Sequence, residues 1–78
     1  GVFSNKKIMF TGGFKDMSRS EAKATAENNG GKVLGSISKK LDYLVVGESK
    51  PTKKKIDQAK ELGIKIILEK EWNKILDS

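Results

Sequence analysis

The chain of 78 residues contains no cysteine and no histidine, and Arg19 is its only arginine. Without cysteine, no disulfide can staple the fold and no thiolate can act as nucleophile or metal ligand. Without histidine, the chain lacks the commonest general base at neutral pH and the commonest zinc ligand. No apolar run approaches membrane-spanning length, and the N-terminus carries no signal-peptide pattern.

Carboxylates are the remaining candidates for acid–base chemistry. The chain has ten of them, scattered along the sequence and mostly next to lysines. No close pair is evident of the kind that drives two pKa values apart. We therefore expect no catalysis by this chain alone, and neither a metal site nor a cofactor of its own.

Size and charge define what the chain can do instead. A chain this short can form one small domain, over residues 1–78, and the absence of an initial Met favours a piece of a larger protein. The net charge of +6 has two interpretations. It can reflect a lysine-rich surface without a specific partner, or it can serve nucleic-acid binding, in which clustered cations displace counterions from phosphates. Which of the two interpretations applies depends on where the charges lie in the fold.

Short apolar runs and turn residues divide the chain into alternating elements. Ser18 and Glu21 have the S-x-x-E spacing of a capping box, and Thr52 is the expected N-cap of a second helix. Glycines at 30–31, 47 and 63 end elements. Strands are expected at 7–10, 32–34, 43–46 and 64–68, and helices at 18–29, 52–62 and 69–76.

Apolar spacing indicates which side chains face inward. Ile56, Ala59 and Leu62 form the expected inner stripe of the second helix. Trp72 lies on an inward stripe of the last helix, so we interpret it as a core residue rather than a stacking platform.

The element order predicts an α/β fold with a small parallel sheet. Helical connections make neighbouring strands parallel. The loop at 35–42 is too short for a crossover helix, which places the second strand outside the first. The expected strand order is 2-1-3-4, with three helices covering both faces. Ligands of such sheets bind beyond the carboxyl ends of the strands, where the strand order reverses. Here that point lies between the segments 11–13 and 47–52.

Cations gather at this point, at two expected helix starts. Arg19 begins the first helix and Lys53, Lys54 and Lys55 begin the second. A helix N-terminus is electropositive, so cations there are unfavourable unless an anion binds. The alternative is a solvated charge run. A hydroxyl and an unhindered backbone N–H, as at Thr11-Gly12, suit phosphate oxygens. Neither TGGFKD nor GESKPTK fits a dinucleotide or P-loop motif.

Several segments together resemble the BRCT family over nearly the whole chain. They are FTGGFKDMSRSEAK, NNGGKVLGSISKKLDYLVVGES, AKELGIKII and EKEW. The pattern is most similar to the BRCT subgroup of bacterial NAD-dependent DNA ligases, in which the module closes the C-terminus. The large subunit of replication factor C carries a similar module.

The resemblance implies a phosphate site. In phosphate-binding members, a Ser or Thr after the first strand, the next glycine and a lysine of the second helix hold the phosphate, which matches Thr11, Gly12 and Lys55. In the module of replication factor C an arginine joins them, matching Arg19, and the ligand is a DNA 5′-phosphate end. Lys53 and Lys54 are hypothetical auxiliary contacts. Ligase modules usually read G-S-K before this helix, whereas this chain has KPTKKK, and Leu41 replaces a usual Thr.

The function expected from the resemblance is that of a non-catalytic, DNA- and phosphate-binding module that helps hold DNA at a strand break in replication and repair. The expected parent is an NAD-dependent DNA ligase, whose NAD and divalent metal belong to other domains. Expected partners are DNA and the parent's other domains, with no membrane, for a monomer in the bacterial cytoplasm near the nucleoid. Two alternatives remain open: a protein-interaction module, binding a phosphoprotein or its own parent chain, and a structural spacer without a ligand.

Overall fold

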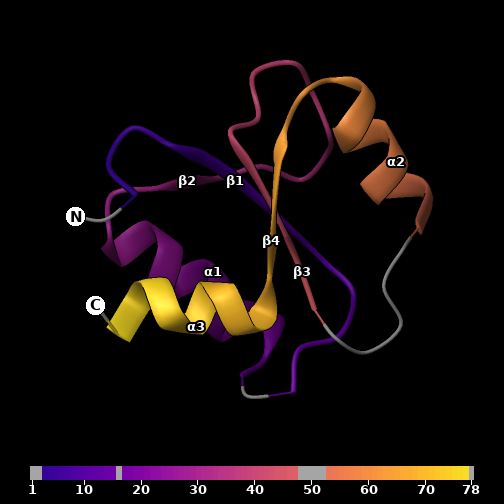
Figure 1. Ribbon diagram of the computed structural model, residues 1–78. Helices are drawn as coiled ribbons and strands as arrows, with labels where there is room; N and C mark the ends of the chain where they lie inside the picture. The colour runs from indigo at the N-terminus through magenta and orange to yellow at the C-terminus, as the bar shows by residue number, and fades with distance from the viewer. Residues whose placement is uncertain (1–2, 16, 48–52, 78) are drawn as a thin grey trace.

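The computed structural model describes residues 3–15, 17–47 and 53–77 (Figure 1). These residues form one four-stranded parallel sheet and three helices. In chain order the elements are β1 (Lys7–Thr11), α1 (Arg19–Asn28), β2 (Lys32–Val33), β3 (Tyr43–Val46), α2 (Lys53–Glu61), β4 (Lys65–Leu68) and α3 (Glu69–Asp77). All of the expected elements are present, although β1 includes Thr11, which was expected to follow it.

The sheet has the strand order β2-β1-β3-β4, which confirms the predicted topology. β1 is central and pairs in parallel with both β2 and β3. Ile8, for example, is in register with Val33 on one side and Tyr43 on the other. The short connection from β2 to β3 therefore passes across β1 without a crossover helix, as its length predicts.

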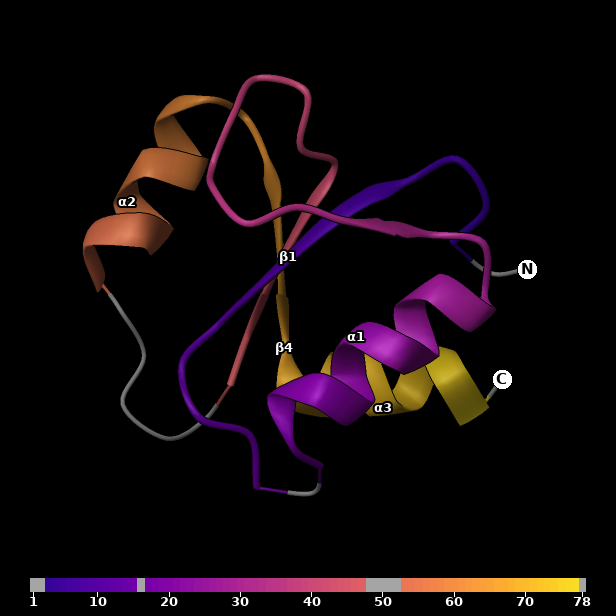
Figure 2. The ribbon, with the colours of Figure 1, turned by 180° about the vertical axis from the view of Figure 1, so that it is seen from behind.

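Helices cover both faces of this sheet, as predicted. Figures 1 and 2 show α1 and α3 together on one side and α2 alone on the other. Strand residues alternate between the two sides, so each side has its own buried cluster. The cluster under α1 and α3 contains Phe3, Ile8, Phe10, Ala22, Ala26, Val45, Ile67 and Trp72. The cluster under α2 contains Met9, Leu41, Leu44, Val46, Ala59 and Ile64.

Aromatic rings dominate the cluster under α1 and α3. The ring of Phe3 stacks on Trp72 at a centroid distance of 4.7 Å, and Phe10 meets the same indole edge-to-face at 5.2 Å. Trp72 is completely buried, so its assignment to the core is confirmed. Ala22 and Ala26 have small side chains, which let α1 pack close to the sheet.

Local signals at the ends of α1 also act as predicted. The hydroxyl of Ser18 accepts from the backbone N–H of Glu21 at 3.1 Å, and the Glu21 side chain accepts from the Ser18 N–H, completing the capping box. Gly30 has φ +87°, the left-handed conformation that ends helices. The expected N-cap of α2, Thr52, lies outside the described residues.

One inward-facing prediction is wrong. Leu62 was expected to complete the inner stripe of α2, but it is 41% exposed. The helix ends at Glu61, and Leu62 lies in the turn that Gly63 makes with φ +73°. The helical spacing therefore no longer applies at Leu62, and the buried Ile64 fills the core beyond the turn. None of the described helices is both long and apolar enough to cross a membrane.

Candidate phosphate-binding site

The turn after β1 rests directly on the end of β3. Gly12 has φ +81°, and the Gly47 backbone N–H donates to the Thr11 carbonyl oxygen at 2.9 Å. A Cβ atom added to Gly47 would lie 2.4 Å from the Gly13 carbonyl oxygen. Glycine is therefore required at 47, because the two backbones touch there. The point where the strand order reverses is consequently filled by backbone rather than left open between β1 and β3.

Thr11 is the last residue of β1 and is buried, with 2% of its surface exposed. Strand alternation places its side chain on the same face as Met9, the face that α2 covers. The Thr11 side chain is therefore almost completely enclosed.

Arg19 folds back onto the turn that follows β1. Its guanidinium donates through Nη2 to the Gly12 carbonyl oxygen at 3.1 Å. Among the described residues this is the one hydrogen bond of the guanidinium, which carries five N–H donors. The other donors lie on an exposed side chain at the start of α1. The structure thus brings Arg19 and Gly12 together.

The lysines of α2 approach from the other side of the sheet. Lys53 and Lys54 are exposed and Lys55 is half-buried, and the first turn of α2 contains no acidic residue. Lys55 lines a hollow on the face of Met9 and Thr11. No hydrogen bond within the described chain connects Lys55 to Thr11, Gly12 or Arg19. The predicted residues therefore form two groups, Arg19 with Gly12 and Lys55 beside the α2 hollow, and Thr11 belongs to the strand between them.

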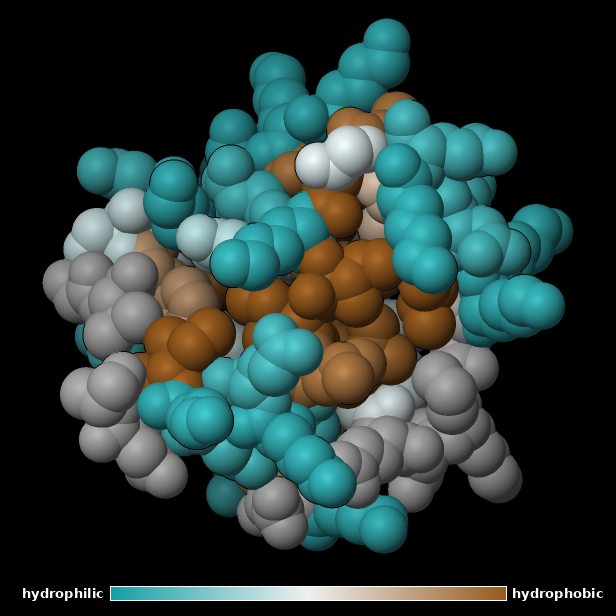
Figure 3. All heavy atoms as spheres, in the orientation of Figure 1, coloured by the Kyte–Doolittle hydropathy of each residue, from teal (hydrophilic) through white to brown (hydrophobic). Residues whose placement is uncertain are grey.

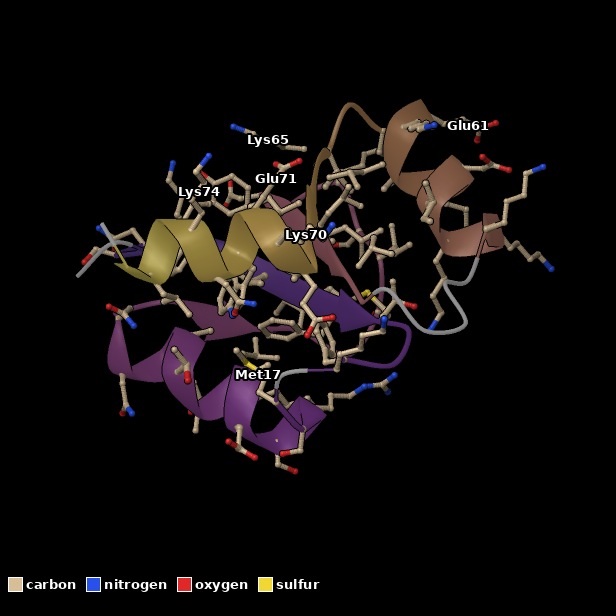
Figure 4. All side chains as sticks on the ribbon, turned by 60° about the horizontal axis from the view of Figure 1, so that its bottom comes forward. Met17, Glu61, Lys65, Lys70, Glu71 and Lys74 are labelled. Carbon is tan, nitrogen blue, oxygen red and sulfur yellow. The ribbon has the colours of Figure 1, made fainter. Side chains whose placement is uncertain are left out.

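Sequence reasoning missed one residue of this region, Glu69. It is 1% exposed, at the start of α3, and the Lys15 backbone N–H donates to both of its carboxylate oxygens at 3.1 and 2.9 Å. Met17 adds a second anchor: it packs against the aromatic cluster and lies between α1 and α3 (Figure 4). These contacts anchor the turn that carries the candidate site to α3 and to the aromatic cluster. An acidic residue opening a helix is a common pattern, so only the fold reveals the partner of Glu69.

Acidic residues elsewhere do not suggest a metal centre. In the part of the chain that the structure describes, no group of three or more Asp, Glu, His or Cys side chains could hold an ion. The described chemistry of this end of the sheet consists of cations, backbone N–H groups and one buried carboxylate that a backbone N–H contacts.

The architecture is that of a small α/β module with a parallel sheet, and comparison with known proteins names its family. The family model described as the BRCA1 C Terminus (BRCT) domain matches residues 1–76. The chain belongs to the BRCT family.

The similar proteins include several bacterial DNA ligases. The chain is 51% identical over 77 residues to the DNA ligase of Pelagibacter ubique (strain HTCC1062), covering 99% of this chain and 11% of the ligase. It is 45% identical to the DNA ligase of Clostridium botulinum (strain Eklund 17B / Type B), covering 96% of this chain and 11% of that protein. The DNA ligase of Parasynechococcus marenigrum (strain WH8102) is 44% identical over the full chain and 11% of its own length. The chain thus spans about a tenth of these curated relatives.

Proposed function

We propose that this chain is the non-catalytic BRCT module of a bacterial NAD-dependent DNA ligase and that it helps hold DNA at a strand break. The similarity to DNA ligases over 95–99% of the chain supports this parent. Adenylation and nick sealing, with NAD and a divalent metal, belong to the other domains of that parent. The module acts in the cytoplasm, at the nucleoid, with DNA and the parent's domains as its partners and without self-association.

The proposed ligand is a terminal or backbone phosphate of DNA. Arg19 and Gly12 supply one side of the site and Lys55 the other, with Thr11 at the end of β1 between them. The observation that carries this assignment is the hydrogen bond from Arg19 to the Gly12 carbonyl, at 3.1 Å. It holds a guanidinium, which suits bidentate phosphate binding, at the turn whose glycine permits close approach. Lys53 and Lys54 add contacts to the backbone nearby.

Binding to matched DNA ends tests the proposal. The chain is titrated with a duplex whose recessed 5′ end carries either a phosphate or a hydroxyl. Fluorescence anisotropy is recorded at several salt concentrations. We expect affinity to fall steeply with salt, with a logarithmic slope near 0.9 per neutralised phosphate. The phosphorylated end should bind about tenfold or more tightly, the equivalent of ~1.4 kcal/mol. Equal affinity for both ends would refute end recognition while leaving general DNA binding.

Variants that each remove one positive charge test the roles of Arg19 and Lys55. Arg19→Ala and Lys55→Ala should each reduce affinity for the phosphorylated end about tenfold and lower the salt slope by about one. Lys60→Ala removes the same charge from the last turn of α2, away from the site, and should change affinity much less. If Lys60→Ala matches the other two variants, the binding is diffuse and the site assignment is wrong.

A protein-interaction role is the second candidate, and an apolar surface favours it. Leu68 on the edge strand β4 is 50% exposed, and an apolar area lies between α2 and α3 (Figure 3). Lys65, Glu71 and Lys74 point outward on the side of α3 away from α1 (Figure 4). Docking through this area should respond weakly to salt and should be lost in Leu68→Asp, a variant that leaves phosphate-dependent DNA binding intact.

A further inference from the structure

A hollow of about 280 Å³ lies between α2, the connection from β2 to β3, and the middle of β1. In both Figures 1 and 2 this connection runs beside α2 on the same side of the sheet. The residues lining the hollow are Met9, Gly35, Ser36, Ile37, Lys55 and Gln58. Lys55 is the only member with a role in the proposed phosphate site, so the rest of the hollow lacks an assigned use.

The walls of this hollow combine an apolar floor with a polar rim. Met9 is 4% exposed and Ile37 packs against the same buried cluster, so the floor is apolar and the half-buried Ile37 is its more accessible part. Ser36 and Gln58 are exposed at the rim, a hydroxyl and a primary amide without charge. Sites for drug-sized ligands typically enclose ~300–1,000 Å³, and this hollow of about 280 Å³ is smaller. It therefore suits a single planar ring system rather than a larger molecule.

Its position relative to the proposed phosphate site suggests which ring it could hold. Met9 and Thr11 are alternate residues on one face of β1, roughly 6.6 Å apart along the strand at about 3.3 Å per residue. That separation is comparable with the span from the 5′-phosphate of a nucleotide to its own base. We propose that the hollow binds the unpaired base of the 5′-terminal nucleotide whose phosphate lies at Thr11 and Gly12. This inference rests on the proposed function.

The side chains that line the hollow can each contact a particular part of a base. Ile37 contacts the ring face, and the Met9 thioether lies beneath it, where sulfur packs favourably against an aromatic ring. The Gln58 amide can pair with the N6 and N7 edge of adenine, the pairing that glutamine makes most readily. Ser36 adds one hydroxyl that donates or accepts. The expected preference is therefore for a purine end, adenine first.

Duplexes with a one-nucleotide 5′ overhang test the inference. The 5′-phosphorylated overhang carries adenosine, thymidine or an abasic tetrahydrofuran, and the same set is made with a 5′-hydroxyl. We expect the phosphorylated abasic end to bind about fivefold or more weakly than adenosine, as removal of a stacked base does. Amide signals of Ser36 and Gln58 in ¹⁵N–¹H spectra should shift with adenosine and stay unchanged with the abasic end.

A matched pair of amide variants assigns the effect to the hollow. Gln58→Ala should remove the preference for adenosine over thymidine while the dependence on the phosphate persists. Asn28→Ala removes an exposed amide from α1, on the other side of the sheet, and should preserve the preference. Equal binding of abasic and adenosine ends with a retained phosphate effect overturns this inference alone. Loss of the phosphate effect overturns the proposed function and the inference together.

Discussion

The two faces of the sheet are built differently. Under α1 and α3, the rings of Phe3 and Phe10 both contact Trp72, and the buried carboxylate of Glu69 accepts from the Lys15 N–H. Under α2 the buried residues are aliphatic apart from Met9, and a hollow remains beside Lys55. One face is closed by rings, and the other is covered by one helix and a loop. The difference teaches that the packed face holds the turn in place while the looser face offers room for a ligand.

Among the variants that test this comparison, Trp72→Ala should cause the largest loss of stability. The indole contacts both Phe3 and Phe10, so its removal should leave a cavity that the rings cannot fill. We expect a loss of about 3–5 kcal/mol in the free energy of unfolding, a large share of the stability of a small domain. Urea unfolding followed by far-UV circular dichroism measures it without relying on indole fluorescence.

The matched variant on the other face is Leu44→Ala, which removes a fully buried side chain under α2. It should cost less than Trp72→Ala, and Leu62→Ala at the exposed turn should cost less than about 0.5 kcal/mol. If Leu44→Ala proves as severe as Trp72→Ala, the two faces contribute equally to stability and the contrast between them fails.

Gly47→Ala sharpens the comparison at the point where the faces meet. The added methyl would lie 2.4 Å from the Gly13 carbonyl oxygen, a backbone atom that cannot move without displacing the turn. We expect a loss of about 1–3 kcal/mol and weaker phosphate-dependent DNA binding. Gly35→Ala is the control for stability alone, because a Cβ there meets no atom within 4 Å. A Gly47→Ala protein with unchanged stability would show that the two backbones do not press together.

Glu69→Gln gives the smallest expected effect among the variants of buried residues. It keeps the size of the side chain but replaces one carboxylate oxygen near the Lys15 N–H with an amide group that cannot accept. We expect a loss of about 1–2 kcal/mol and a shifted Lys15 amide signal in ¹⁵N–¹H spectra. Glu71→Gln, an exposed neighbour in the first turn of α3, is the matched control. Equal effects of the two variants would assign the loss to helix-end charge rather than to the anchor.

Most of the fold could be predicted because its signals are local. The capping box needs only Ser18 and Glu21, three residues apart, and the strand order follows from the short loop at 35–42. Leu62 escaped prediction because the helix ended one residue earlier than its apolar spacing indicated. A periodic pattern specifies a face only while the helix continues.

Less of the candidate site than of the fold could be predicted from the sequence. Proximity of Arg19 to Gly12 follows from a short turn, and their hydrogen bond agrees with it. The contact between Glu69 and Lys15 and the touching backbones at Gly13 and Gly47 join segments far apart in the chain, which no local pattern encodes. The binding roles of Thr11, Gly12, Arg19 and Lys55 stay predictions, since they concern a ligand rather than the fold.

The stack of Phe3 on Trp72 has a mechanical consequence. It joins the first described residues to the last helix, and both chain ends lie on the side remote from α2 (Figures 1 and 2). Tension applied to the two ends would act first across this stack and the edge around it. A tether at either end would therefore load the face under α1 and α3, and the face under α2 would lie outside that load.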